Sequence, residues 1–74
     1  MTKEELAKEI KTELQRIGAT EQEGELSGGI TAWIDGETVF VGDEGHQEEA
    51  TLETLDRLRE VPDNAGWEAA WEAI

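Results

Sequence analysis

The sequence contains no cysteine, so neither a disulfide bond nor a thiolate metal site can stabilise the fold. Histidine and serine occur once each, as His46 and Ser27, and no nucleophile-elbow motif surrounds either residue. Carboxylates abound, but general acid–base catalysis needs one in an apolar setting that raises its pKa, and nearly all of these occupy solvent-facing positions. We therefore expect no enzyme activity and no cofactor.

Long apolar runs are also absent, and the N-terminus lacks the basic-then-apolar pattern of a signal peptide. The expected location is therefore the cytoplasm. A chain of 74 residues makes one domain, residues 1–74, near the lower size limit for a self-sufficient core.

Basic residues are scarce: six lysines and arginines face nineteen acids, which gives a net charge of −13. The four acids of residues 1–16 are matched by four bases, whereas residues 17–74 hold only Arg57 and Arg59 as bases. Nucleic acids and anionic membranes are poor partners for such a charge, and a basic protein surface is a good one.

The acidity is also compatible with disorder, with an ordinary solvated surface and with adaptation to high salt. High net charge with modest hydrophobicity is typical of disordered chains, although regular apolar spacing and three tryptophans argue against disorder here. On an ordinary solvated surface, Glu53 and Arg57 would form a routine helix pair. A halophilic protein would show the same acidic excess with scarce lysine.

Residues 30–41 form the one stretch with clear strand character, and Asp35-Gly36 lies in their middle. Asp-Gly between β-branched and aromatic residues predicts a two-residue hairpin turn, because both central residues of such a turn need positive φ. That turn would pair Ile34 with Glu37. Alternate side chains share a face, so one face is aliphatic and the other carries the aromatic residues. The aliphatic face would hold Ile30, Ala32, Ile34, Val39 and Val41, and the other Thr31, Trp33, Thr38 and Phe40.

Helical periodicity lies on both sides of the hairpin. Apolar residues spaced by three and four predict a helix over residues 3–17, with a capping box at Thr2 and Glu5 and a left-handed cap at Gly18. A leucine stripe predicts a second helix over residues 47–60, and a short last helix follows the single proline. The buried faces would be Leu52, Leu55 and Leu58 on the second helix and Trp67, Ala70, Trp71 and Ile74 on the last.

Between the first helix and the hairpin, Glu21, Glu23 and Glu25 alternate with other residues, which indicates an edge strand protected by charge. The expected fold is therefore α+β, a single small domain in the order α-β-β-β-α-α. Its three-stranded antiparallel sheet would consist of this edge strand and the two hairpin strands.

The acids themselves are the candidate functional residues. Glu49, Glu53, Asp56 and Glu60 would form one stripe about 16 Å long on the second helix. That spacing resembles the spacing of phosphates along a nucleic-acid strand within a factor of about two. A row of fixed carboxylates can compete with nucleic acid for lysine and arginine side chains, with fast, salt-sensitive association.

A second group of acids surrounds the hairpin. Asp35 and Glu37 would lie at its tip, and Asp43, Glu44 and Glu48 around the loop that follows it. Four of these acids could meet at one end of the hairpin as cation ligands: Asp35, Glu37, Asp43 and Glu44. The chain has neither EF-hand spacing nor a histidine pair, so we expect no specific metal site.

The element order, the short length and the hairpin from Ile30 that runs into acids at Glu44, followed by a helix from Gln47, resemble small phage-encoded anti-CRISPR proteins of the DNA-mimic type. The resemblance implies a stoichiometric inhibitor that occupies the site where a CRISPR effector reads the protospacer-adjacent motif (PAM). It also implies that the acids around the hairpin replace phosphates or base-edge acceptors facing effector arginines. Those acids are Asp35, Glu37, Asp43, Glu44 and Glu48.

The alternative is an acidic protein–protein interaction domain, with or without halophilic adaptation, that binds through Trp33 and Phe40. Either function predicts a protein partner, with no direct nucleic-acid or membrane binding, and a monomer or a dimer. For mimicry, the partner is a basic nucleic-acid-binding protein, such as a CRISPR effector or subunit in the host cytoplasm. The predicted partner-binding residues are Asp35, Glu37, Asp43, Glu44, Glu48, Glu49, Glu53, Asp56 and Trp33.

Overall fold

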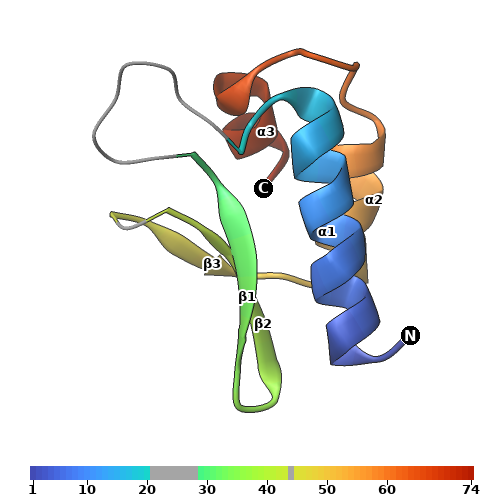
Figure 1. Ribbon diagram of the computed structural model, residues 1–74, viewed down its shortest axis with the longest axis vertical. Coiled ribbons are helices and arrows are strands. Elements are labelled where there is room, and N and C mark those ends of the chain that lie inside the picture. Colours follow the sequence, from blue (N-terminus) through green and yellow to red (C-terminus); the bar gives the residue numbers. More distant parts are fainter. Residues whose placement is uncertain (21–28, 44) are drawn as a thin grey trace.

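The computed structural model describes residues 1–20, 29–43 and 45–74, and it confirms the α+β class and the order α-β-β-β-α-α. The described strands form one antiparallel sheet in the order β1-β2-β3. Helix α1 lies against one face of this sheet, and α2 and α3 pack on α1 away from the strands (Figure 1). The elements are α1 Lys3–Ile17, β1 Thr31–Asp35, β2 Thr38–Gly42, β3 Gln47–Glu49, α2 Leu52–Arg59 and α3 Trp67–Ala73.

Helix α1 has the predicted bounds and both predicted caps. The Thr2 hydroxyl accepts a hydrogen bond from the Glu5 amide at 3.1 Å, and Gly18 takes a left-handed conformation with φ of 83°. The Glu5 carboxylate reaches back to the Thr2 hydroxyl, at 3.2 Å, and not to its amide. This well-capped helix is the element on which the sheet and both other helices pack.

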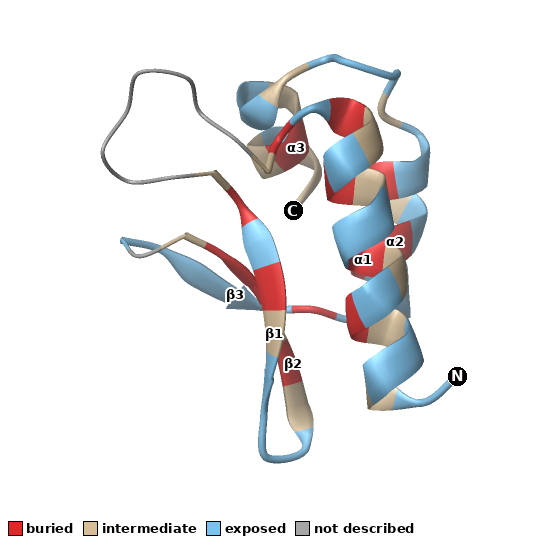
Figure 2. Ribbon diagram, viewed as in Figure 1, coloured by how far each residue is buried: buried red, intermediate tan, exposed pale blue. Residues whose placement is uncertain are grey.

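The core lies on both sides of α1. Figure 2 shows buried positions on the sides of α1 and the sheet that face each other. Because the helix also contacts α2, its buried stripe joins the sheet to the C-terminal helices in one cluster. The largest fully buried side chains are Ile10, Leu14, Ile17, Ile30, Leu55, Leu58 and Val41.

The hairpin turn lies one residue later than predicted. Asp35 pairs with Thr38, so Gly36 and Glu37 occupy the turn, and the predicted Ile34–Glu37 pair is wrong. Only Gly36 of the two turn residues has positive φ, at 64°, which is the pattern of a type II′ turn. The shift places the left-handed position on glycine and avoids it at Asp35, where a side chain would be strained. Both predicted faces survive, because moving the turn by one residue keeps the same alternation.

The strand that completes the sheet differs from the predicted one. The proposed strand around Glu21 to Glu25 lies outside the described residues, and β3 pairs with β2 instead. The predicted second helix includes residues 47–49, but α2 begins only at Leu52. The reason is a reciprocal cap, since the Thr51 and Thr54 hydroxyls each accept a hydrogen bond from the other residue's amide. Leu52 is 55% exposed, and Thr54 joins the buried stripe in its place.

Two arginines bind the ends of the C-terminal helices. The Arg16 guanidinium donates to the carbonyls of Val61 at 2.7 Å and Leu58 at 3.0 Å, where α2 ends. It also pairs with Asp63 and Glu13, each at 2.7 Å, and these hydrogen bonds raise the pKa of Arg16 above its usual value. Arg57 similarly donates to the Ala73 carbonyl at 2.7 Å and to the Ile74 carbonyl at 3.3 Å, at the end of α3. Both residues donate to carbonyls at or just beyond a helix end, where the regular backbone hydrogen bonding of the helix stops.

We expect Arg16→Gln to lower the melting temperature by several degrees, because glutamine cannot reach two carbonyls and two carboxylates at once. The matched control is Arg59→Gln, which makes the same charge change but removes only long contacts, 3.7 Å to Glu9 and 3.9 Å to Asp56. Thermal unfolding followed by circular dichroism compares the two. Equal shifts would mean that Arg16 acts only through its charge.

Candidate partner-binding surface

The two faces of the sheet have different surroundings. Helix α1 covers the aliphatic face, where Ala32, Val39 and Val41 are buried. No described helix packs against the opposite face, because α2 and α3 contact α1 and each other but none of the strands (Figure 1). Trp33 and Phe40 on this face are half-buried and lie outside the core cluster.

We call this surface the open face. Its members share one side of the sheet through strand alternation and the observed register. At its centre the rings of Trp33 and Phe40 are stacked, with centroids 6.0 Å apart and 23° between their planes. They are direct cross-strand partners and not the diagonal neighbours that the predicted turn implied. The open face comprises Thr31, Trp33, Asp35, Thr38, Phe40, Gln47 and Glu49.

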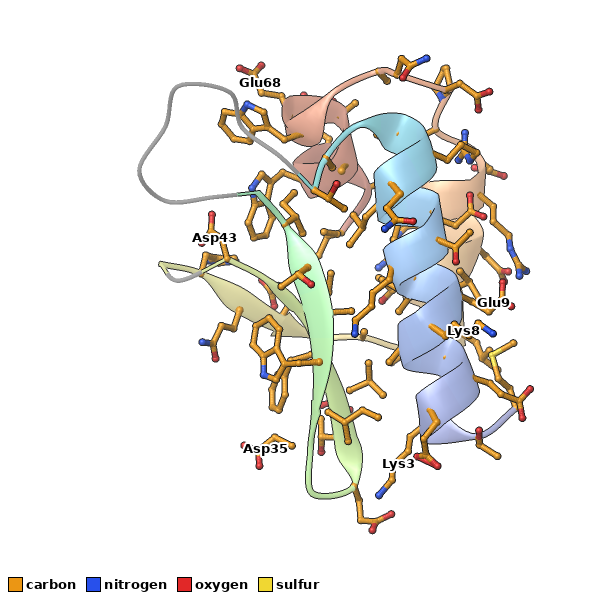
Figure 3. The ribbon with its side chains drawn as sticks, in the orientation of Figure 1. Lys3, Lys8, Glu9, Asp35, Asp43 and Glu68 are labelled. Atoms are coloured by element: carbon orange, nitrogen blue, oxygen red, sulfur yellow. The ribbon has the colours of Figure 1, made fainter. Side chains whose placement is uncertain are left out.

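Two predicted acids flank the aromatic pair. Glu49 lies opposite Phe40, so Trp33, Phe40 and Glu49 form one row across the three strands. Opposed side chains on neighbouring strands are about 5 Å apart at their Cβ atoms. Asp35 follows Trp33 by two residues, about 7 Å along the same face, and Figure 3 shows it directed away from α1. Within the described residues neither Asp35 nor Glu49 forms an ion pair, so two carboxylates without counter-ions border the aromatic rings.

Two other predicted acids, Glu37 and Glu48, have side-chain partners within the fold. Glu37 at the turn pairs with Lys3 Nζ at 3.2 Å, and the same ammonium donates to the Gly36 carbonyl at 2.8 Å. Figure 3 shows Lys3 extending from α1 toward the hairpin tip, which it therefore fastens to the helix. Glu48 on β3 lies 2.9 Å from the Nε2 atom of His46.

Asp43 stabilises the loop between β2 and β3 through side-chain hydrogen bonds. Its Oδ1 atom accepts hydrogen bonds from the amides of Gly45 at 2.8 Å and His46 at 2.9 Å. The His46 ring lies edge-on to Trp71 of α3, with centroids 5.2 Å apart, so the loop also contacts the last helix. Among the described residues the other carboxylate oxygen of Asp43 has no hydrogen-bond donor.

The predicted helical stripe of acids does not form, because Glu49 lies on β3 and Glu60 is the cap residue at the end of α2. Glu53 and Asp56 do lie on α2, where they are highly exposed and pair with Arg57 at 2.9 Å and Arg59 at 3.9 Å. Since α2 contacts no described strand, these two acids belong to a different surface from the open face.

The other predicted grouping, at one end of the hairpin, is also wrong. Asp35 lies at the turn, whereas Asp43 follows the far end of β2, and Figure 3 shows the two at opposite ends of the sheet. Glu44 and Ser27 lie outside the described residues. In the parts of the chain that the structure describes, no three histidine, aspartate or glutamate side chains approach closely enough to hold a metal ion. The helices of the same parts are too short or too polar to cross a membrane.

No protein-family model matches the chain, and no curated protein or solved structure matches it either. Its function therefore has to be argued from its own surface chemistry. That surface offers an aromatic pair with a carboxylate on either side, on a sheet whose residues 29–49 include neither lysine nor arginine.

We expect Asp43→Ala to destabilise the fold by about 1–3 kcal/mol, because two amides lose their acceptor. Asp43→Asn keeps an oxygen at the same position, so it should cost much less. Urea unfolding of the two variants gives the comparison. A loss of stability as large for asparagine as for alanine would show that the charge, and not the hydrogen bonding, closes this loop.

Proposed function

We propose that this protein is a stoichiometric inhibitor that binds a basic nucleic-acid-binding protein in place of its nucleic acid. The observation that carries the proposal is the charge distribution: residues 17–56 contain no lysine or arginine, and the whole described sheet falls within them. Asp35 and Glu49 have no counter-ion in the described fold, so the cations of a partner are their natural complement. No cofactor takes part in this mechanism.

The mechanism is competition for basic side chains. Carboxylates on the sheet accept ion pairs and hydrogen bonds from lysine and arginine side chains that otherwise hold phosphates or read bases. The net charge of −13 attracts such a protein over a distance and makes association sensitive to salt. The packing of α1 and the Lys3 contact to the turn hold the hairpin in place, which limits the entropy lost on binding.

The resemblance to anti-CRISPR proteins supplies a specific target: the DNA (PAM)-binding site of a CRISPR effector, in the cytoplasm of a cell infected by phage. Under this proposal, the primary contacts are Asp35 and Glu49, with Glu37 and Glu48 as secondary contacts. The secondary pair is exposed enough to exchange its internal partner for a cation of the effector. The acids of α2 contribute to the long-range field only.

The open face also favours a second candidate function, a protein–protein interaction domain that binds through its aromatic residues. The stacked, half-buried Trp33 and Phe40 outside the core are the observation behind it. Such binding depends on burial of apolar surface and changes little with salt.

The test measures how this protein lowers the affinity of purified CRISPR effectors for PAM-containing DNA, by fluorescence anisotropy. Neutralising Asp35 and Glu49 together, as Asp35→Asn with Glu49→Gln, should weaken inhibition by about tenfold or more, because each loses charge-assisted contacts. The matched control, Glu53→Gln with Asp56→Asn, makes the same charge change on α2 and should stay within about twofold of the parent.

Three results would contradict the proposal in different ways. Equal losses in the two double variants would mean that only the net charge matters. Unchanged inhibition in both, with loss in Trp33→Ala, would favour the aromatic interaction domain. Unaltered DNA binding by every effector would rule out CRISPR effectors as the target.

A further inference from the structure

The open face has chemistry that suits one kind of side chain in particular. We propose that it binds an arginine of the partner protein, with the guanidinium stacked on Trp33 and paired with Asp35. This inference rests on the proposed function, which supplies a basic partner, and it names the contact through which that partner is recognised.

The position of Trp33 provides the stacking surface. Phe40 lies against one side of the indole, with the ring planes only 23° apart. Strand β1 is at the edge of the described sheet, so no described strand lies on the other side of the indole. The indole is partly exposed and no described strand lies beyond it, so a planar group of a partner can approach the ring on the side away from Phe40.

The charges around this position favour a cation. Asp35 is on the same face of the same strand, about 7 Å from Trp33, which is within the reach of a guanidinium that lies over the ring. Glu49 lies beyond Phe40, about 10 Å from Trp33 across two strand spacings, and is placed to hold a second basic side chain of the same segment. No lysine or arginine of residues 29–49 competes for either carboxylate.

Arginine suits this site better than lysine does. Its guanidinium is planar and weakly hydrated, so it stacks on an aromatic face while its edge donates to a carboxylate. An ammonium keeps more of its hydration and lacks the planar fork. A second copy of this chain is a poor occupant, because two open faces would bring the acids of both copies together at a net charge of −13 each.

The experiment titrates the protein, labelled with ¹⁵N, with hexa-arginine and with hexa-lysine, two peptides of equal charge, and follows the indole N–H signal of Trp33. We expect hexa-arginine to bind about three- to tenfold more tightly than hexa-lysine and to shift this signal most. Trp33→Leu should remove the preference while leaving residual binding of both peptides, and the same spectra show whether the fold is retained. Trp33→Phe keeps a ring and should retain part of the preference.

Asp35→Asn should weaken hexa-arginine binding more than Glu68→Gln, a matched loss of one charge on α3 at a distance from the open face (Figure 3). Equal affinities of the unaltered protein for the two peptides would overturn the inference, as would equal effects of these two substitutions. Effector inhibition that survives in Trp33→Leu would overturn the arginine site and leave the inhibitor function standing. An arginine preference without inhibition of any effector would support the arginine site and overturn the inhibition of CRISPR effectors.

Discussion

The structure depends on where its few cations lie. Of six lysines and arginines, Arg16 and Arg57 bind the C-terminal ends of α2 and α3, and Arg59 lies between Glu9 and Asp56. Lys3 extends away from the helical layer and binds the turn of the hairpin. Because Arg16 and Arg57 donate to carbonyls at the ends of short helices, their side chains lie within the helical layer. The described sheet has acids and no basic residue of its own.

Because the arginines lie in the helical layer, the acids of α2 and the acids of the open face have different surroundings. On α2 an acid has an arginine one turn away, so the helix is close to an ordinary solvated surface. On the open face, Asp35 and Glu49 lack such neighbours among the described residues, and their repulsion is relieved only by solvent, salt or a partner. The proposed function therefore rests less on the number of acids than on the acids left without a cation, which depend on tertiary contacts.

Much of the fold could be predicted from local pattern because its signals are local. The caps of α1 and the alternation of the hairpin faces follow from spacings of two to four residues. The element order is the expected one, but its third strand is β3, which was predicted as part of a helix. Prediction failed where two local signals competed. The leucine spacing predicted a helix from residue 47, but the Thr51–Thr54 cap makes the helix begin at Leu52. Asp35-Gly36 predicted a turn with two left-handed residues, but the turn is Gly36-Glu37, which needs only one. No described helix covers Trp33, and this depends on which helix packs on which face of the sheet, a choice about which periodicity carries no information.

Approximate free energies indicate whether charge or apolar contact alone could supply the affinity for a partner. Half-buried Trp33 and Phe40 leave apolar surface on the order of 100 Å² for a partner, worth about 2–3 kcal/mol. Association costs about 4–15 kcal/mol in lost freedom, so the aromatic pair alone is insufficient. Exposed ion pairs of about 0.2–1 kcal/mol each are insufficient as well.

The register places Trp33, Phe40 and Glu49 in one row. Under the proposed function, a partner that covers the rings would also remove water from the carboxylate, which would make up this shortfall. Charge-assisted hydrogen bonds formed in that drier setting are worth about 1.5–3 kcal/mol each. Under the proposed function, charge and apolar burial therefore act on the same segment of the partner, and neither is sufficient without the other.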